Sequence, residues 1–301
     1  MSAPIDGVLV VDKPAGPTSH DVVSVGRRAL GTPKVGHTGT LDPMASGVLV
    51  LVVGRATRLA RYMSGDEKVY EAQVTFGRST DTYDALGATT LDTGRQPERD
   101  ALAAALAAYT GPIVQTPPAF SAKKIAGEAA YKRARRDAPV LPDPVAVTVH
   151  ALGLTAYDRG IATLTLRVSA GFYVRSLAHD LGTKFGTGAH LSALRRTRAG
   201  AFGLDQAVPW ETLAGGGAVV QAAVLPIDRL LPEIPGVVLA MPDATRVRHG
   251  QTVLALLPPG TQGSPLRLLD QGGRLIGIAK ASPHPAAGPS PWLLQPVVIV
   301  G

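Results

Sequence analysis

Short apolar runs alternate along this chain of 301 residues with longer segments that mix apolar and polar positions. Short runs that are rich in β-branched residues and closed by glycine are typical of buried strands. Residues 48–53, all Val or Leu and followed by Gly54, are the clearest case. Helices are predicted where Ser, Thr or Asp can cap a segment, or where Ala and Leu dominate it. The predicted strands are residues 7–14, 48–53, 69–76, 145–152 and 161–170, the predicted helices are 18–30, 57–63, 99–109, 129–136 and 174–185, and residues 112–122 are predicted to form a loop.

The pattern changes near residues 230–236, where Leu, Pro and Gly predominate. Beyond this point, short apolar runs are broken by Gly and Pro and show little helical periodicity. We therefore predict a first domain of mixed α/β (α+β) class over residues 1–234, followed by a small β-rich domain over residues 235–301. Residues 281–291 are low in complexity and predict a loop within the second domain.

The composition of the chain indicates what kind of partner it binds. The formal net charge is +7 and the isoelectric point is about 9.8, which favours a polyanionic partner such as nucleic acid, although an Arg-rich coding bias produces the same balance. The chain has no cysteine, which excludes disulfides, thiolate metal sites and a cysteine nucleophile and fits the cytoplasm. We expect no signal peptide and no membrane span.

Asp42 is the leading candidate for chemistry. It lies in a segment punctuated by Gly36, Gly39 and Gly47, just before the apolar run at 48–53. Proline at the next position directs Asp42 toward an extended conformation, so its carboxylate is expected on a constrained loop beside the core. A charge in such a place needs a partner. Catalysis and the capping of a turn are equally good explanations at this point.

Other polar residues have both a functional and a structural interpretation. Lys13, between a strand and a helix start, fits a phosphate contact or a simple turn, and His37 fits a base contact or a surface histidine. Tyr70 fits a core tyrosine, and the polar segment 78–84 fits a hydrogen-bonded turn. Arg175, beside an aromatic pair, needs an acidic partner if it is buried, and Asp42 is the obvious candidate.

Basic clusters at residues 123–124, 132–136 and 195–198, with Tyr131 and Phe120 nearby, favour an RNA or DNA surface over ordinary solvated faces. Several chemistries are disfavoured because their motifs are missing from the sequence: a phosphate-binding Walker loop, GxGxxG after a strand, HExxH and GxSxG. What remains is a carboxylate in a basic setting, without a metal or a cofactor.

An ordered series of motifs runs from about residue 7 to residue 230. The main motifs are Asp12-Lys13-Pro14-x-Gly16-x-Thr18-Ser19, Gly36-His37-Thr38-Gly39-Thr40-Leu41-Asp42-Pro43, Lys68-x-Tyr70, Thr80-Asp81-Thr82-x-Asp84, Pro117-Pro118-x-Phe120-Ser121-Ala122, Gly171-x-Tyr173-x-Arg175-Ser176-Leu177 and Gly188-Ala189-His190-Leu191-x-x-Leu194-Arg195-Arg196-Thr197. This series resembles the TruB family of tRNA pseudouridine synthases. A weaker resemblance, through Gly250-Gln251-x-Val253 and Gly277-Ile278-Ala279, links the C-terminal segment to the family's PUA-type RNA-binding domain.

The resemblance implies a central, mostly antiparallel sheet flanked by helices and loops, with an RNA-gripping insertion at about residues 117–142. It implies isomerisation of uridine 55 in the T loop of tRNA, by a monomer without cofactor or metal. Asp42 would start the bond exchange, with Tyr70 on the target base and Arg175 paired with the carboxylate. The resemblance assigns the remaining roles in substrate and RNA binding to Lys13, His37, Lys123, Tyr173, Leu194, Arg195 and Arg196, with Leu194 as a wall of the uracil pocket and His37 entering the RNA loop.

Three alternatives remain at this stage. The chain could be a tRNA-binding or folding factor whose catalysis is secondary, or a related guide-RNA-dependent synthase that works inside a ribonucleoprotein. A carboxylate glycosidase is the most distant alternative, because it needs a second, unpaired acid for which the sequence offers no candidate.

Overall fold

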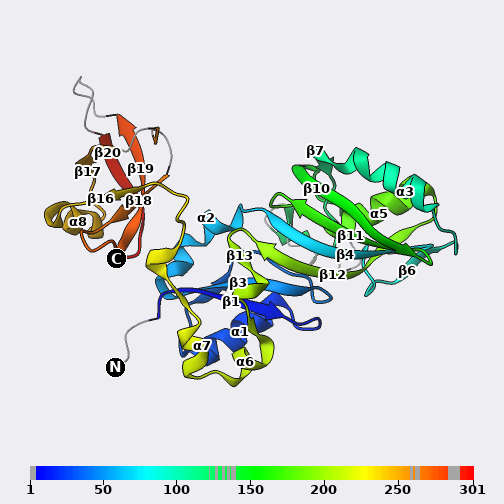
Figure 1. Cartoon of the computed structure of the whole chain (residues 1–301), viewed down its shortest axis with the longest axis horizontal. Coiled ribbons are helices and arrows are strands. Elements are labelled where there is room, and N and C mark those ends of the chain that lie inside the picture. The colour runs from blue at the N-terminus through cyan, green and yellow to red at the C-terminus, as the bar shows by residue number, and fades with distance from the viewer. Residues whose placement is uncertain are drawn as a thin grey trace.

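The structure is a computed structural model that describes residues 5–121, 123–125, 128–130, 133, 136, 140–257, 260–261, 265–283 and 292–301. Within these residues, eleven strands form the main sheet, whose central order is β14-β1-β3-β12-β4-β11-β10-β7 (Figure 1). The strands are β1 (Gly7–Lys13), β2 (Val35–His37), β3 (Ser46–Val53), β4 (Lys68–Phe76), β7 (Gly111–Gln115), β10 (Val145–Asp158), β11 (Ile161–Val168), β12 (Ala189–Ala199), β13 (Phe202–Gly203), β14 (Val208–Pro209) and β15 (Leu225–Pro226).

Neighbouring strands in this sheet run antiparallel except for the pairs β1–β14 and β3–β12. The strands β4 and β12 lie side by side in the middle, with Tyr70 opposite Arg196 and Ala72 opposite Leu194. The mixed α/β class and the mostly antiparallel sheet are therefore confirmed. The start of β3 pairs with Arg195 and Arg196 of β12, which brings the loop before β3 beside β12.

Helices cover the sheet in two groups. The helices α1, α6 and α7 lie together beside β1 and β3, whereas α3 and α5 lie at the other end of the sheet (Figure 1). The helical segments are α1 (Ser19–Leu30), α2 (Ala60–Ser64), α3 (Arg99–Leu106), α5 (Val174–Phe185), α6 (Trp210–Gly215), α7 (Ala218–Ala222) and α8 (Met241–Arg248), with 3-10 turns η1 (Gly54–Leu59), η2 (Ala107–Tyr109), η3 (Leu204–Gln206) and η4 (Ile227–Arg229).

Local signals account for the start and end of α1. The hydroxyl of Thr18 accepts a hydrogen bond from the backbone of Asp21, and the Asp21 carboxylate accepts one from the backbone of Thr18 in return. Gly31 ends the helix at φ +63°, a left-handed conformation that suits glycine. These short-range bonds confirm the predicted helix.

Two segments differ from the sequence predictions. Residues 112–122 were expected to form a loop, but residues 111–115 form β7 at the sheet edge, where β10 pairs with it and Pro112 is tolerated. Residues 128–129 pair as a strand with 124–125, which contradicts the predicted start of a helix at 129. In the rest of this predicted helix, residues 130 and 133 are helical, and residues 131, 132, 134 and 135 lie outside the described residues. Of the predicted loop 281–291, β19 includes 281–283, and residues 284–291 lie outside the described residues.

The C-terminal module is β-rich, as predicted. Its sheet has the order β16-β18-β19-β20-β17, and it lies at one end of the molecule beyond α2 (Figure 1). Leu275, Ile278 and Val300 share a hydrophobic core with Val50 and Leu59 of the first part of the chain. The boundary at residue 235 stays a prediction, whereas the sheet itself begins at Gly236. The strands of this C-terminal sheet are β16 (Gly236–Val238), β17 (Val253–Ala255), β18 (Pro265–Leu269), β19 (Leu275–Pro283) and β20 (Trp292–Ile299). Two further pairs of short strands lie in the first part of the chain: β5 (Arg78–Thr80) with β6 (Thr89–Asp92), and β8 (Lys124–Ile125) with β9 (Glu128–Ala129).

Candidate active site

A cavity of about 800 Å³ opens where the loop before β3, the start of α5 and the strands β4 and β12 meet. It brings together segments that are far apart in the sequence. Seven of the predicted site residues line it: His37, Asp42, Tyr70, Tyr173, Arg175, Leu194 and Arg196. Lys13, Lys123 and Arg195 are not among the residues described as lining it.

Asp42 sits on a loop that is tied to the start of α1. The hydroxyl of Ser19 accepts a hydrogen bond from the backbone N–H of Leu41 at 2.8 Å and donates one to the Leu41 carbonyl at 3.0 Å. The Asp42 carbonyl accepts a further bond from the N–H of Ala45. This local bonding leaves the Asp42 carboxylate about one-third exposed, with its side chain facing the cavity.

Arg175 is the partner of Asp42, as the sequence analysis inferred. Its Nη2 donates to Oδ1 of Asp42 at 3.0 Å, and its Nε lies 2.9 Å from Oδ2 without the angle of a hydrogen bond. The guanidinium is almost wholly buried, with 6% of the side chain exposed. A buried Arg stabilises a site only if its other donors are satisfied.

Two more loops accept hydrogen bonds from the Arg175 guanidinium. Its Nη1 donates to the carbonyl of Thr82 at 3.1 Å, and its Nη2 donates to the carbonyl of Phe120 at 3.0 Å. The buried carboxylate of Asp84 lies 3.6 Å from Nη1. One guanidinium therefore joins the Asp42 loop, the loop after β5 and the segment after β7.

Lys13 lies behind the Asp42 loop and has no exposed surface. Its Nζ donates to the carbonyls of Pro14, Pro17 and Pro43. Burial lowers the pKa of Lys13 to about 8, which the negative charge of Asp42 partly opposes. This ammonium holds the loop from the inside, and the expected contact of Lys13 with RNA phosphate stays a prediction.

Arg196 also holds the Asp42 loop in place, through hydrogen bonds to backbone carbonyls. It is 2% exposed and donates from Nε to the Val48 carbonyl at 2.7 Å, and from Nη2 to the Gly39 carbonyl at 3.0 Å. Gly47 permits this approach, because a Cβ there would lie 2.1 Å from the Arg196 carbonyl oxygen. In this structure Arg196 donates hydrogen bonds to three backbone carbonyls, and its expected contact with the RNA backbone stays a prediction.

Tyr70 and Leu194 form an apolar surface in the cavity. They lie on the adjacent strands β4 and β12 and are 9% and 8% exposed. A ring and an aliphatic side chain on neighbouring strands provide a flat wall that a planar base can contact.

His37 and Tyr173 add two neutral polar groups. Burial lowers the pKa of His37, and the nearby positive charges of Arg196 and His20 lower it further. Burial raises the pKa of Tyr173, and the guanidinium of Arg175 opposes this shift. Both side chains are therefore uncharged at neutral pH, so that either can pack against a base without the cost of burying a charge.

Two buried polar residues were not given a role in the site by the sequence analysis. Gln115 exchanges two hydrogen bonds with the backbone of Tyr173, at 2.8 Å and 2.9 Å, and so fixes the segment that enters α5. Asp84 lies in the segment predicted as a polar turn, which is confirmed: its Oδ1 accepts from the Thr82 hydroxyl and the Leu86 N–H. Its proximity to Arg175 could not be predicted, because a turn residue is ordinarily solvated.

The remaining predicted RNA contacts lie outside the cavity. Lys123 is exposed, and Arg195 is partly exposed and paired with Asp12 at 2.8 Å. In the cluster at 132–136, residues 132, 134 and 135 lie outside the described residues, as does Tyr131. Among the described residues, no group of three or more His, Asp or Glu side chains is arranged to hold a metal ion. No helix in the described part of the chain is long and apolar enough to cross a membrane.

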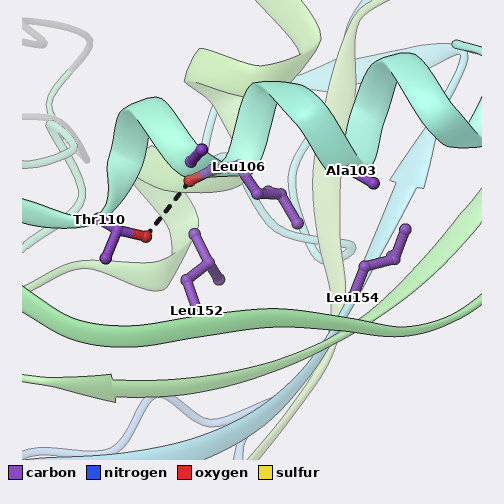
Figure 2. A pocket seen from close by; sticks show the side chains of 6 residues that line it. Ala103, Leu106, Thr110, Leu152 and Leu154 are labelled. Carbon is purple, nitrogen blue, oxygen red and sulfur yellow. Dashed lines mark hydrogen bonds between the residues drawn. The ribbon is translucent and has the colours of Figure 1, made fainter.

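A second hollow, of about 650 Å³, lies between α3 and β10 (Figure 2). Leu106, Leu152 and Leu154 line it, and Thr110 closes one side with a hydrogen bond to the Leu106 carbonyl. None of the described residues that line it is ionisable, so the chemistry belongs to the first cavity.

Comparison with solved structures identifies the class of fold. The chain aligns with the protein in "Crystal Structure of a Cbf5-Nop10-Gar1 Complex" at a TM-score of 0.71 and 27% identity, over 92% of this chain and 78% of that one. A "Crystal structure of the archaeal box H/ACA sRNP Nop10-Cbf5 complex" matches at 0.74 and 24% identity, over 99% and 86%, which shows the fold alone. Both matches place this chain in the fold class of proteins solved in Cbf5-containing complexes.

Sequence comparison identifies the family. Residues 27–174 match "TruB family pseudouridylate synthase (N terminal domain)", residues 175–232 match "tRNA pseudouridylate synthase B C-terminal domain", and residues 235–285 match "Pseudouridine synthase II TruB, C-terminal". Two relatives are both named "tRNA pseudouridine synthase B". The protein of Solibacter usitatus (strain Ellin6076) is 46% identical over 82% of this chain and 85% of its own length, and that of Thermobifida fusca (strain YX) is 42% identical over 91% and 94%. The chain belongs to the TruB family of pseudouridylate synthases, which confirms the resemblance seen in its motifs.

Proposed function

We propose that this enzyme converts uridine 55 in the T loop of tRNA to pseudouridine, with Asp42 as the catalytic carboxylate. The observation that carries the proposal is the Asp42–Arg175 pair, which lies inside the cavity of a chain from a pseudouridine synthase family. Relatives named for tRNA supply the substrate class.

The reaction exchanges one bond for another without a net change in atoms. The bond between uracil N1 and ribose C1′ breaks, the uracil rotates, and a bond forms between C5 and C1′ while the proton on C5 is lost and N1 gains one. An ionised Asp42 can act either by attacking C1′ or by assisting formation of a glycal. Arg175, which contacts Asp42 directly, orients that carboxylate and balances its negative charge.

The cavity must receive a base that has left the RNA stack. Extrusion of a base costs a few kcal/mol, and contact with an aromatic side chain returns about 1–3 kcal/mol per base. We assign the uracil to the wall formed by Tyr70 and Leu194, with Tyr70 placed to assist removal of the C5 proton. His37 and Tyr173 contact the neighbouring RNA.

The RNA backbone is held outside the cavity, where we assign contacts to the exposed Lys123 and to Arg195. Affinity should fall steeply with salt, because each neutralised phosphate releases counterions. The protein acts as a monomer in the cytoplasm, and residues 235–301 form a PUA-like domain that adds to RNA binding.

Release of tritium from uracil C5 in a T-arm RNA tests this proposal. Asp42→Asn should abolish release while RNA affinity stays within about twofold of wild type, because the amide preserves the shape of the side chain but cannot carry negative charge. Asp100→Asn, which alters an exposed carboxylate on α3, is the matched control and should release tritium at the wild-type rate. Turnover by Asp42→Asn would remove Asp42 from the catalytic role.

The structural match to proteins solved in Cbf5-containing complexes favours one second candidate, a guide-RNA-dependent synthase. Purified wild-type chain should modify the T-arm RNA alone. Turnover that requires added proteins or a guide would favour this second candidate. Tight RNA binding with no turnover in either setting would favour a tRNA-binding or folding factor.

A further inference from the structure

Tyr83 has a backbone conformation that is unusual for its residue type. Its φ is +63°, in the left-handed region that glycine adopts freely and a bulky residue does not. Such strain persists only where surrounding contacts hold the residue in place, and it concentrates at functional sites.

Three contacts hold Tyr83. Its N–H donates a hydrogen bond to the Thr80 carbonyl at 3.3 Å. Its ring is stacked on the ring of His179 of α5, with centroids 3.9 Å apart and planes 13° apart. Its carbonyl accepts a hydrogen bond from the N–H of Leu191 in β12 at 3.0 Å. The Nδ1 of His179 is buried with no hydrogen-bond partner among the described residues, so the stack and the surrounding packing hold this ring.

The Tyr83–His179 stack is connected to Arg175 in two ways, through the loop and through α5. Along the loop, Thr82 and Asp84 flank Tyr83, and these are the two residues through which the loop contacts the guanidinium. Along α5, His179 follows Arg175 by four residues, which places both side chains on the same face of the helix. The Tyr83–His179 stack therefore joins the loop to the helix that carries Arg175.

We propose that Tyr83 and His179 are positioning residues, whose stack holds the Thr82 carbonyl and the Asp84 carboxylate against Arg175 and so keeps Arg175 aimed at Asp42. This inference rests on the proposed function and names the support of the same site. Neither residue is among those that line the cavity, so the stack acts on the reaction through Arg175 and not by touching RNA. Burial lowers the pKa of His179 and raises that of Tyr83, which keeps both rings neutral near pH 7.

The test compares Tyr83→Gly with Tyr83→Phe in the full chain. Glycine accepts φ +63° without strain but has no ring, whereas phenylalanine keeps the ring and loses only the hydroxyl. In steady-state assays of tritium release from the T-arm RNA, Tyr83→Gly and His179→Ala should each lower kcat by about five- to a hundredfold, with KM within twofold, because small misplacements of a catalytic group cost up to about a hundredfold. Tyr83→Phe should retain at least half of the wild-type kcat.

Hydrogen exchange of the amides of residues 81–88 gives a second readout that does not depend on the RNA. Exchange should be faster in Tyr83→Gly and His179→Ala than in wild type, and unchanged in Tyr83→Phe. An unchanged kcat in both disruptive variants would overturn the inference, as would a raised KM with normal kcat or an equal loss in Tyr83→Phe. If the wild type fails to turn over the RNA, the proposed function is wrong, and unchanged exchange in the disruptive variants then overturns the inference on its own.

Discussion

Replacement of Arg175 by methionine should separate the stability of the site from its chemistry. Methionine fills a similar volume without charge, so the main loss is electrostatic. At an effective dielectric constant of about 20, charges 2.9 Å and 3.6 Å apart, as from Arg175 to Asp42 and Asp84, attract by about 4–6 kcal/mol each. Desolvation cancels much of this attraction, and breaking a buried pair typically costs about 3–5 kcal/mol in the free energy of unfolding.

The two carboxylates should contribute unequally to that loss. Asp42 is 31% exposed and can be hydrated once its partner has gone, whereas the Asp84 side chain is 8% exposed and would remain as a buried, unpaired charge. In the Arg175→Met background, Asp84→Asn should therefore recover about 1–3 kcal/mol, because an amide keeps the accepting oxygen for Thr82 and Leu86 and carries no charge.

Urea unfolding, followed by intrinsic fluorescence, measures this recovery, and tritium release measures the chemistry. Turnover should stay absent in both Arg175→Met and the double variant, because Asp42 lacks its partner in each. Asp81→Asn in the same background is the control, since Asp81 lies on the same turn but is exposed. Equal recovery by Asp81→Asn, or none by Asp84→Asn, would refute the assignment of the stability loss to the buried Asp84 charge.

Three further variants test the supports of the Asp42 loop. Between pH 8 and 10.5, the free energy of unfolding of wild type should rise relative to that of Lys13→Met by up to about 3 kcal/mol. The reason is that Lys13 releases its proton near pH 8 in the folded protein but keeps it until about pH 10.5 in the unfolded chain. Urea titrations at several pH values measure this difference, and parallel pH profiles of the two proteins would contradict the prediction. Gly47→Ala should lower the melting temperature by several degrees, because the added Cβ meets the Arg196 backbone, whereas Gly65→Ala, with open space around it, should leave the melting temperature unchanged. Arg196→Lys should lower kcat by about tenfold or more with little change in RNA affinity, since lysine cannot reach Gly39 and Val48 together; weakened RNA binding with normal kcat would show instead that Arg196 contacts RNA.

Some elements could be predicted because their causes are local. The capping box of Thr18 and Asp21 and the glycine at position 31 define α1 through bonds between residues at most four positions apart. The apolar run at 48–53 predicts β3 because a buried strand needs no distant partner to be recognisable. By contrast, β7 begins with Gly111 and Pro112, which favour a loop, and it is a strand because β10 pairs with it.

The family, the class of fold and the leading candidate carboxylate can be recognised from the sequence alone, since motif order and apolar pattern are properties of the chain. Which charges are buried follows only from the way distant segments fold together. Lys13 and Arg196 are indistinguishable in sequence from RNA-binding cations, but both point inward to backbone carbonyls. The same folding also pairs Asp42 with Arg175, 133 positions away, through which Asp42 gains its buried partner. The physical reason is that burial and pairing of a charge depend on which distant segments fold against it, and that information lies in the packing of the sheet and not in the neighbouring residues.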